Sequence, residues 1–455
     1  MTTTALPPVT DAAAERRAQL IEPPATGIRI TADRLRVWGI RSALSVFDQG
    51  LTAAVGFGVN VLLARWLLPD AYGAFAIAFA GFLFIAGFHN VLLLEPLTVM
   101  GPSGHAKRLP LYFREQLAVH ALFVGALSAV ILLAGLVLWR ITPESPLVGA
   151  VMGSGLALPF VLLLWLVRRM CYVLQRPSTA VLGSTFCSLF VFGGLSALQH
   201  FGRITPFSAF ALMGFGSLLA ASVLLLQLKL QPMENTFPRR PILSREVLRE
   251  DWLYGRWLLG SAILYSVSSQ AQMFLVAAWL GLGAAGILRA MQIPALAMTQ
   301  VIAATGLLVL PAFSYDFGRE TTARMRHKAM LVSGSIGGAA IAFAALLVPF
   351  AGITEHLLFG GKYAAYASLM PLLALVPAAI GASIGYSMAL RASQRPHFDL
   401  AANAIAAPVG IISAAVFIHW WGLVGAAASM VLSFAAYTVV TYWAYYGTAR
   451  GYFRD

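Results

Sequence analysis

The sequence predicts an all-α integral membrane protein with about twelve transmembrane helices, arranged as two parallel six-helix halves around a central cavity. Of its 455 residues, 59% are hydrophobic and only 11% are charged, and the mean hydropathy is +0.78. A soluble domain carries about 25% charged residues, and one water-facing core cannot bury so much apolar side chain. Most of the surface must therefore be solvated by lipid.

Twelve apolar stretches reach the length of about 20 residues that a span of the hydrocarbon layer requires. We expect them near residues 43–65, 71–95, 116–139, 147–168, 178–199, 205–228, 254–280, 285–311, 328–351, 365–389, 399–419 and 422–446. They form an N-terminal bundle over 42–228 and a C-terminal bundle over 253–447. A polar linker over 229–252 joins the bundles, with a disordered or amphipathic tail over 1–41 and a short tail over 448–455.

Basic residues are distributed unevenly between the two sides of this topology. If the N-terminus is cytoplasmic, the cytoplasmic segments hold 26 Lys and Arg residues, and the external segments hold only Arg65, Arg140, Arg203 and Lys362. This asymmetry is the positive-inside pattern, so we expect a multi-pass protein with both termini in the cytoplasm. The net charge of +13 then reflects topology, and no nucleic-acid partner is expected.

The two halves repeat each other at low identity. The run ARWLLPDAYG closes the first span and AAWLGLGAAG closes the seventh, which places Gly73 and Gly286 at equivalent positions. The tripeptide Gln-Arg-Pro follows the fourth span at Arg176 and the tenth at Arg395, at nearly the same offset along the chain. Because each half has an even number of spans, the halves point the same way and are related by an axis along the membrane normal.

Catalytic and metal-binding patterns are missing from the sequence. It contains no Walker glycine loop, GxSxG or HExxH motif. The two cysteines, Cys171 and Cys187, lack metal-ligand spacing, and the external loops are too short for a catalytic domain. We therefore expect a transporter and not an enzyme, without a cofactor and driven by an ion gradient or the membrane potential.

The run DQGLTAAVGFGVNVLLARWLLPDAYGAFAIAFA, which starts at Asp48, resembles bacterial polysaccharide-biosynthesis flippases of the multidrug/oligosaccharidyl-lipid/polysaccharide (MOP) exporter superfamily. The runs FLVAAWLGLGAAGILRAMQIPA and GLVGAAASMVLSFAAYTVVTYW are similar to later parts of that family. The resemblance implies a MATE/MOP-like fold that flips an undecaprenyl-diphosphate-linked oligosaccharide across the bacterial inner membrane, for O-antigen, capsule or exopolysaccharide assembly. Its expected partners are this lipid-linked oligosaccharide and membrane lipids, with polysaccharide polymerase and chain-length proteins as further candidates.

A more distant likeness is to peptidoglycan-precursor flippases. The run ILRAMQIP resembles their eighth helix, which carries an arginine at the position of Arg289. Their first helix has an Arg-Asp pair where this chain has Val59 and Asn60, and they have fourteen helices. The polysaccharide branch is therefore favoured.

Arg289 is the first candidate for substrate binding, because a charge inside a span costs about 3 kcal/mol unless it faces a wet cavity or a partner. Its planar guanidinium matches diphosphate oxygens. The alternative is an interfacial arginine that reaches the outer lipid headgroups. We expect Asn60 and Gln292 to bind substrate as well, although Asn60 is otherwise a packing residue.

Two acidic residues are candidates for ion coupling. Asp48 is either a cation or proton site at the cytoplasmic mouth, or the partner of Arg41 or of a neighbouring helix. Glu95 either responds to protons or forms an interfacial ion pair. His89 and His120 are expected to be packing residues, with a proton relay as the alternative. Headgroup-binding or structural roles are expected for Arg65, Arg176 and Arg395.

The predicted mechanism is alternating access between the two halves. A MATE-type multidrug or cation antiporter is the first alternative, but it needs acidic residues at the centre of the cavity. A membrane polysaccharide polymerase is a second alternative, and it needs a large external loop, which the sequence does not provide.

Overall fold

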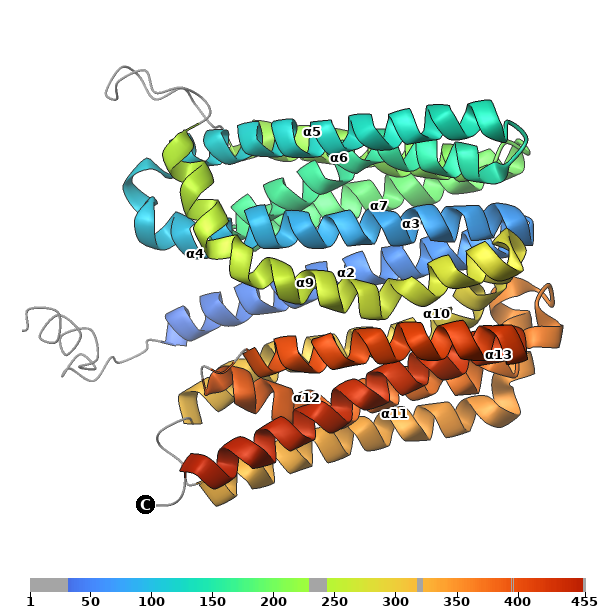
Figure 1. The fold of residues 1–455 in the computed structure, drawn as a ribbon. Helices are drawn as coiled ribbons and strands as arrows, with labels where there is room; N and C mark the ends of the chain where they lie inside the picture. Colours follow the sequence, from blue (N-terminus) through green and yellow to red (C-terminus); the bar gives the residue numbers. More distant parts are fainter. Residues whose placement is uncertain (1–31, 229–243, 317–321, 394, 396, 453–455) are drawn as a thin grey trace, which may run out of the picture.

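The computed structural model describes residues 32–228, 244–316, 322–393, 395 and 397–452, which fold into a bundle of long helices (Figure 1). The N-terminal half consists of α2 (Ala32–Trp66), α3 (Pro69–His89), the π-helical turn η1 (Asn90–Leu94), α4 (Glu95–Gly104), the 3-10 turn η2 (Ala106–Arg108), α5 (Leu109–Ile141), α6 (Pro146–Val173), α7 (Pro177–His200) and α8 (Pro206–Leu228). The C-terminal half consists of α9 (Arg245–Leu280), α10 (Leu282–Asp316), α11 (Thr322–Phe359), the 3-10 turn η3 (Ala364–Tyr366), α12 (Leu369–Ala392) and α13 (His397–Tyr452).

Eleven continuous helical segments among the described residues are long and apolar enough to cross a membrane. The last of these, α13, contains two spans, because its backbone leaves the helical region at Gly422, with φ 55° and ψ −128°. The chain reverses there, so closely that a β-carbon on Gly425 would lie 1.9 Å from the carbonyl oxygen of Phe417. The segment from Pro69 to Gly104 is a single span that runs through η1. The twelve-span fold class predicted from hydropathy is therefore confirmed.

The bundle has two distinct ends. The described chain begins and ends at one of them, the terminal end, on the left in Figure 1. The short connections α2–α3, α5–α6, α7–α8, α9–α10 and α11–α12 lie at the opposite end, the loop end. Most of the predicted tail over 1–41 lies outside the described residues. The predicted linker over 229–252 is described only from residue 244, and α9 begins at Arg245, so its last part is a helical extension of the seventh span.

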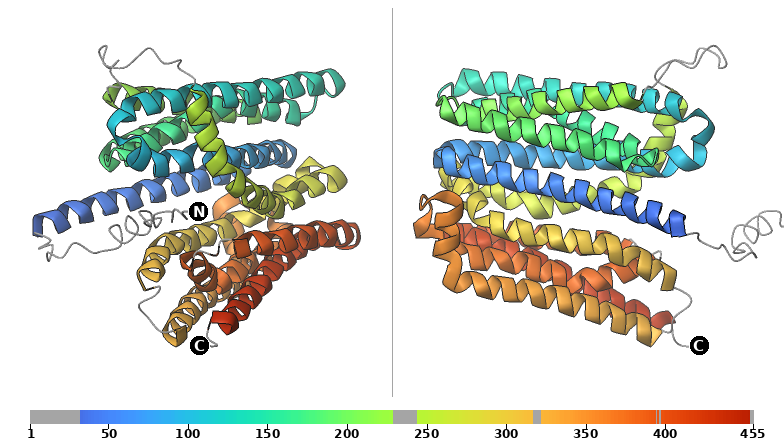
Figure 2. Two further views of the ribbon diagram at one scale, coloured as in Figure 1. Left: turned by 60° about the vertical axis from the view of Figure 1, so that its left-hand side comes forward. Right: turned by 180° about the vertical axis from the view of Figure 1, so that it is seen from behind.

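Within the described part of the chain, the apolar core joins the two halves at the loop end. One cluster of buried side chains there includes Leu63 and Tyr72 of the N-terminal half together with Leu288 and Phe359 of the C-terminal half. Toward the terminal end the core divides into two clusters. One lies in the N-terminal half and also includes Val247 from the start of α9, and the other lies within the C-terminal half. Figure 2 shows the two sets of helices meeting at the loop end. The bundle is therefore closed at its loop end.

Candidate functional site

The two halves approach each other most closely where α3 crosses α10 at the loop end. A β-carbon on Gly73 would lie 1.8 Å from the carbonyl oxygen of Leu282, and one on Gly286 would lie 2.4 Å from that of Pro69. Pro69 and Leu282 are separated by the same offset as the two glycines, so the two repeated segments make the same contact on each other. Only residues without a β-carbon permit this approach.

Arg289 lies two turns into α10, next to this crossing. Its side chain is 8% exposed, its guanidinium carbon lies 5.9 Å from the centre of the Phe79 ring, and the Tyr72 hydroxyl lies beside it. Among the described residues, its Nε finds no hydrogen-bond partner and no carboxylate pairs with it. The side chain is therefore buried in the interface between the halves, and in this conformation it does not reach a lipid surface.

Asn60 is connected to Arg289 through Tyr72, whereas Gln292 contacts a different residue. The Tyr72 hydroxyl donates to Asn60 Oδ1 at 3.3 Å, and Asn60 Nδ2 donates to the Gly56 carbonyl at 2.8 Å. The structure thus brings two of the three predicted substrate-binding residues into one polar group across α2, α3 and α10. Gln292 lies one turn further along α10 and is buried, with its Nε2 3.0 Å from the sulfur of Met430 on α13.

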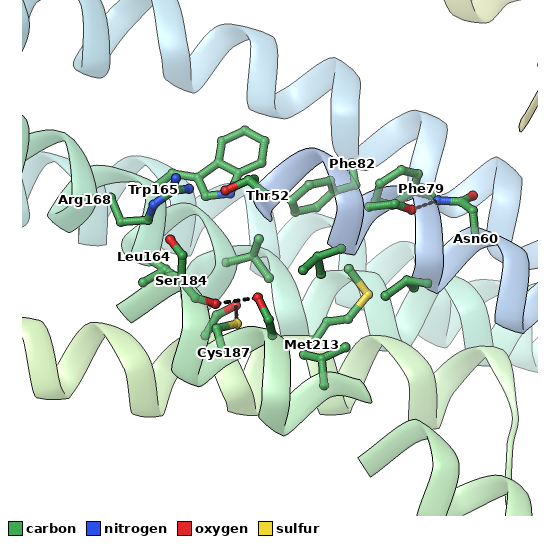
Figure 3. A pocket seen from close by; sticks show the side chains of 17 residues that line it. Thr52, Asn60, Phe79, Phe82, Leu164, Trp165, Arg168, Ser184, Cys187 and Met213 are labelled. Carbon is green, nitrogen blue, oxygen red and sulfur yellow. Dashed lines mark hydrogen bonds between the residues drawn. The ribbon is translucent and has the colours of Figure 1, made fainter. Parts of the chain in front are cut away.

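A cavity of about 140 Å³ lies inside the N-terminal half (Figure 3). Its wall is mostly apolar, with Phe79, Phe82 and Trp165, and Asn60 lies at one end of it and Arg168 at the other. At about 30 Å³ per molecule, the cavity has room for a few waters. Asn60 thus lines this cavity as well as packing against α3 through Tyr72, and its substrate-binding role stays a prediction.

Asp48 lies at the terminal end of the same half and is fully buried. Its Oδ2 accepts a hydrogen bond from Arg168 Nη2 at 2.5 Å and another from the Tyr172 hydroxyl, both on α6. Arg41 instead donates to Gln175, so the partner of Asp48 is the neighbouring helix. Arg168 compensates the negative charge of Asp48 in this conformation, and the ion-coupling role of Asp48 stays a prediction.

Glu95 follows the π-helical turn η1, within the span from Pro69 to Gly104 and nearer to its Gly104 end. It accepts a hydrogen bond from Asn90 Nδ2 at 3.4 Å, and its role in ion coupling stays a prediction. Next to this turn, His89 and His120 lie with ring nitrogens 3.0 Å apart, and His120 contacts the Pro159 carbonyl at 3.1 Å. The two histidines are therefore partners in the core. π-helical turns occur often at functional sites.

The three arginines predicted to bind headgroups or to hold helix ends lie close to helix termini. Arg65 ends α2 at the loop end and directs Nη1 toward the Leu357 carbonyl at 3.4 Å. Arg176 is exposed just before α7, and Arg395 lies between α12 and α13, where its backbone N–H donates to Leu390. Arg176 and Arg395 thus each lie between two helices, and their headgroup contacts stay predictions.

A larger cavity, of about 590 Å³, lies inside the C-terminal half toward the terminal end. Asp399 lines it and accepts hydrogen bonds from Arg391 Nη2 at 2.9 Å and from the Tyr437 hydroxyl at 2.5 Å. Asn403, one turn further along α13, lines it as well. The sequence analysis missed this group, although an Asp and an Asn one helical turn apart in an apolar span are a polar stripe that could have indicated it.

A third polar group ties the start of α9 to the N-terminal half. Gln116 Nε2 on α5 donates to Asp251 Oδ2 at 2.8 Å, and the imidazole of His105 contacts Glu250 at 3.0 Å. Burial, opposed in part by the hydrogen bond from Gln116, raises the pKa of the Asp251 carboxyl to about 7. Asp251 therefore changes charge near neutral pH, a property that its position in the predicted linker did not suggest.

No protein-family model and no curated protein sequence matches the chain. Solved structures do match over most of its length. It is similar to a MATE-family multidrug transporter of the MOP superfamily in an inward-facing conformation, with 12% identity, 90% of this chain and 96% of the other covered, and a TM-score of 0.72. It is also similar to a MATE-family transporter in an outward-facing conformation, with 11% identity, 91% of this chain and 96% of the other covered, and a TM-score of 0.59.

The chain is also similar to the lipid II flippase MurJ in an inward closed conformation. The identity is 12%, the match covers 89% of this chain and 87% of the other, and the TM-score is 0.67. At these identities the likeness concerns the fold alone. The chain therefore shares its fold with MATE-family transporters and with this lipid flippase.

Proposed function

We propose that the protein flips an undecaprenyl-diphosphate-linked oligosaccharide from the cytoplasmic to the outer leaflet of the bacterial inner membrane. The product would serve O-antigen, capsule or exopolysaccharide assembly. Arg289 would contact the anionic head, the polyprenyl tail would stay in lipid, and the halves would alternate in exposing the head to either side. A polysaccharide polymerase and chain-length proteins are the expected partners.

The observation that carries this proposal is the uncompensated positive charge of Arg289 between the halves. A buried cation without a carboxylate costs several kcal/mol unless an anion or water compensates it. Diphosphate oxygens match a guanidinium, and the neighbouring hydroxyl of Tyr72 and amide of Asn60 add polar contacts. The asymmetry of 26 to four basic residues supports the terminal end as the cytoplasmic one.

A MATE-type cation antiporter is the second candidate, and the likeness to MATE transporters favours it. Asp48 would then be its cation site. Against this function, Asp48 is compensated by Arg168, whereas the uncompensated charge at the interface is positive. A positive charge at that position repels a cationic drug and attracts an anionic head.

Complementation of bacterial strains that lack their own polysaccharide flippase tests the proposal. We expect the wild-type protein to restore surface polymer, and Arg289→Gln to lose at least about tenfold of it at matched membrane levels, with Arg289→Lys in between. Arg140→Gln is the control, because Arg140 is an exposed loop-end arginine stacked on Trp139. Failure of the wild type in several hosts, together with resistance to cationic drugs, would establish the antiporter instead.

A further inference from the structure

The connection between α11 and α12 reaches from the C-terminal half to the N-terminal half at the loop end. Gly360 and Gly361 both have positive φ, 72° and 86°, a conformation that residues with a β-carbon rarely adopt. These two glycines reverse the chain directly after α11. The reversal carries Lys362 and Tyr363 to the end of α2.

Lys362 caps the C-terminus of α2 with all of its hydrogen-bonding capacity. Its Nζ donates to the carbonyls of Ala64, Arg65 and Leu67 at 3.2, 2.5 and 2.8 Å. An ammonium has three donors, and the last four carbonyls of a helix lack partners within the helix. The negative end of the helix dipole adds to the attraction.

Tyr363 holds the same connection to α2 and to α11. Its hydroxyl donates to the Ala64 carbonyl at 3.0 Å, and its backbone N–H donates to Glu355 Oε1 on α11 at 2.8 Å. Tyr363 and Glu355 are each 1% exposed. The position of Lys362 is therefore set by α11 and not by a freely moving loop.

A matching contact runs in the opposite direction. Arg65, at the end of α2, directs Nη1 toward the carbonyl of Leu357 near the end of α11, at 3.4 Å. Each half thus offers a cation to a helix C-terminus of the other half. These contacts lie beside the Gly73–Gly286 crossing, where the apolar core is shared between the halves.

We propose that Lys362 and Tyr363, with Arg65, form a latch that holds the loop end closed and must release α2 before that end can open. Lys362 is largely exposed, so on release its ammonium returns to water, which makes the latch reversible. The fold is known in both inward-facing and outward-facing conformations, so such an opening is compatible with its architecture. The latch acts on the equilibrium between conformations whatever substrate is carried.

Distance measurement between spin labels at the loop end tests the latch directly. Labels are placed on Glu144→Cys, between α5 and α6, and His419→Cys, before the reversal in α13, in a background without Cys171 and Cys187. Both labelled positions are exposed and lie on different halves. In the protein reconstituted in lipid, we expect Lys362→Met to raise the population of the longer distance about tenfold. Tyr363→Phe should shift it in the same direction by less.

Lys328→Met is the matched control. Lys328 pairs with Asp316 within the C-terminal half, so its loss should leave the loop-end distance unchanged. A distance distribution in Lys362→Met and Tyr363→Phe identical to that of the wild type would overturn the latch, as would an equal shift in Lys328→Met. No substrate enters the measurement, so its outcome is independent of the flippase proposal.

Discussion

Each half of the molecule contains an aspartate bound to an arginine, and the two halves surround this pair differently. In the N-terminal half, Asp48 is fully buried against Arg168, next to a cavity of about 140 Å³. In the C-terminal half, the side chain of Asp399 is 17% exposed and that of Arg391 is 42% exposed, next to a cavity of about 590 Å³. The first pair is sealed in protein, and the second can be reached by water.

The internal repeat explains part of this difference. At the offset that relates the two Gln-Arg-Pro tripeptides, Tyr172 on α6 corresponds to Arg391 on α12, and Arg168 corresponds to Ser387. Equivalent helix ends therefore supply the partner of each aspartate, but the arginine lies one turn further along in the C-terminal half. The N-terminal pair is buried inside its half, whereas the C-terminal pair is partly exposed beside the larger cavity.

The largest effect that separates the two pairs is on stability. Arg168→Leu leaves the buried carboxylate of Asp48 uncompensated and should cost about 3–5 kcal/mol. Arg391→Leu exposes Asp399 to water and should cost about 1 kcal/mol or less. Thermal unfolding of both variants in detergent measures the difference. Equal losses would show that the two pairs are equivalent and would remove the contrast between the halves.

The crossing of α3 and α10 allows a test of the symmetry between the halves. Because the contact is reciprocal, Gly73→Ala and Gly286→Ala should destabilise the protein by similar amounts, about 1–3 kcal/mol each, through overpacking. At Gly283 the nearest atom to an added β-carbon is Oδ1 of the flexible Asp70 side chain, at 2.7 Å. Gly283→Ala is therefore the tolerated control. The amount of folded protein that remains after mild heating measures the effect of all three substitutions. Destabilisation by only one of Gly73→Ala and Gly286→Ala would contradict the symmetry.

The polar group at the start of α9 should make the N-terminal half sensitive to pH. The pKa of Asp251 is about 7 in the folded protein and about 4 in the unfolded chain. Its contribution to stability is therefore complete below pH 4 and is lost as the pH rises through 7, by about 1 kcal/mol between pH 6 and pH 7. Unfolding midpoints of wild type and Asp251→Asn at these two pH values measure the effect. An unchanged pH dependence in the variant would exclude Asp251 as its source.

The smallest predicted effect compares the two cysteines of the N-terminal half. Cys187 is partly exposed and lines the cavity, whereas Cys171 is completely buried. A small neutral maleimide should label Cys187 slowly and leave Cys171 unlabelled, as mass spectrometry of the intact protein can show. Faster labelling of Cys171 would mean that the interior around Asp48 opens more readily than the sealed pair implies.

The membrane spans were predictable because each depends on a local property, the length of an apolar stretch. The repeat predicted the equivalence of Gly73 and Gly286, and the structure adds that these residues touch. The π-helical turn η1 was not predicted, since its five residues, NVLLL, differ in no obvious way from the surrounding apolar helix. The helical start of α9 was assigned to a linker because it is polar.

The polar partners were much harder to predict. Asp48 and Arg168 lie far apart in the sequence and meet only because α2 packs beside the helices of its half. Lys362 was counted as an external basic residue, and nothing in its local sequence indicates that it caps α2. Pairing between distant helices depends on the packing of the whole bundle, which apolar periodicity does not specify.

The central claim, that Arg289 binds an anionic lipid head, is tested most directly by ligand binding to the purified protein. We would measure the affinity of a polyprenyl diphosphate and of a lipophilic organic cation for the wild type, Arg289→Gln and Asp48→Asn. The account predicts that the diphosphate binds to the wild type and to Asp48→Asn, and binds at least about tenfold more weakly to Arg289→Gln. Binding of the cation alone, abolished by Asp48→Asn and unaffected by Arg289→Gln, would contradict it.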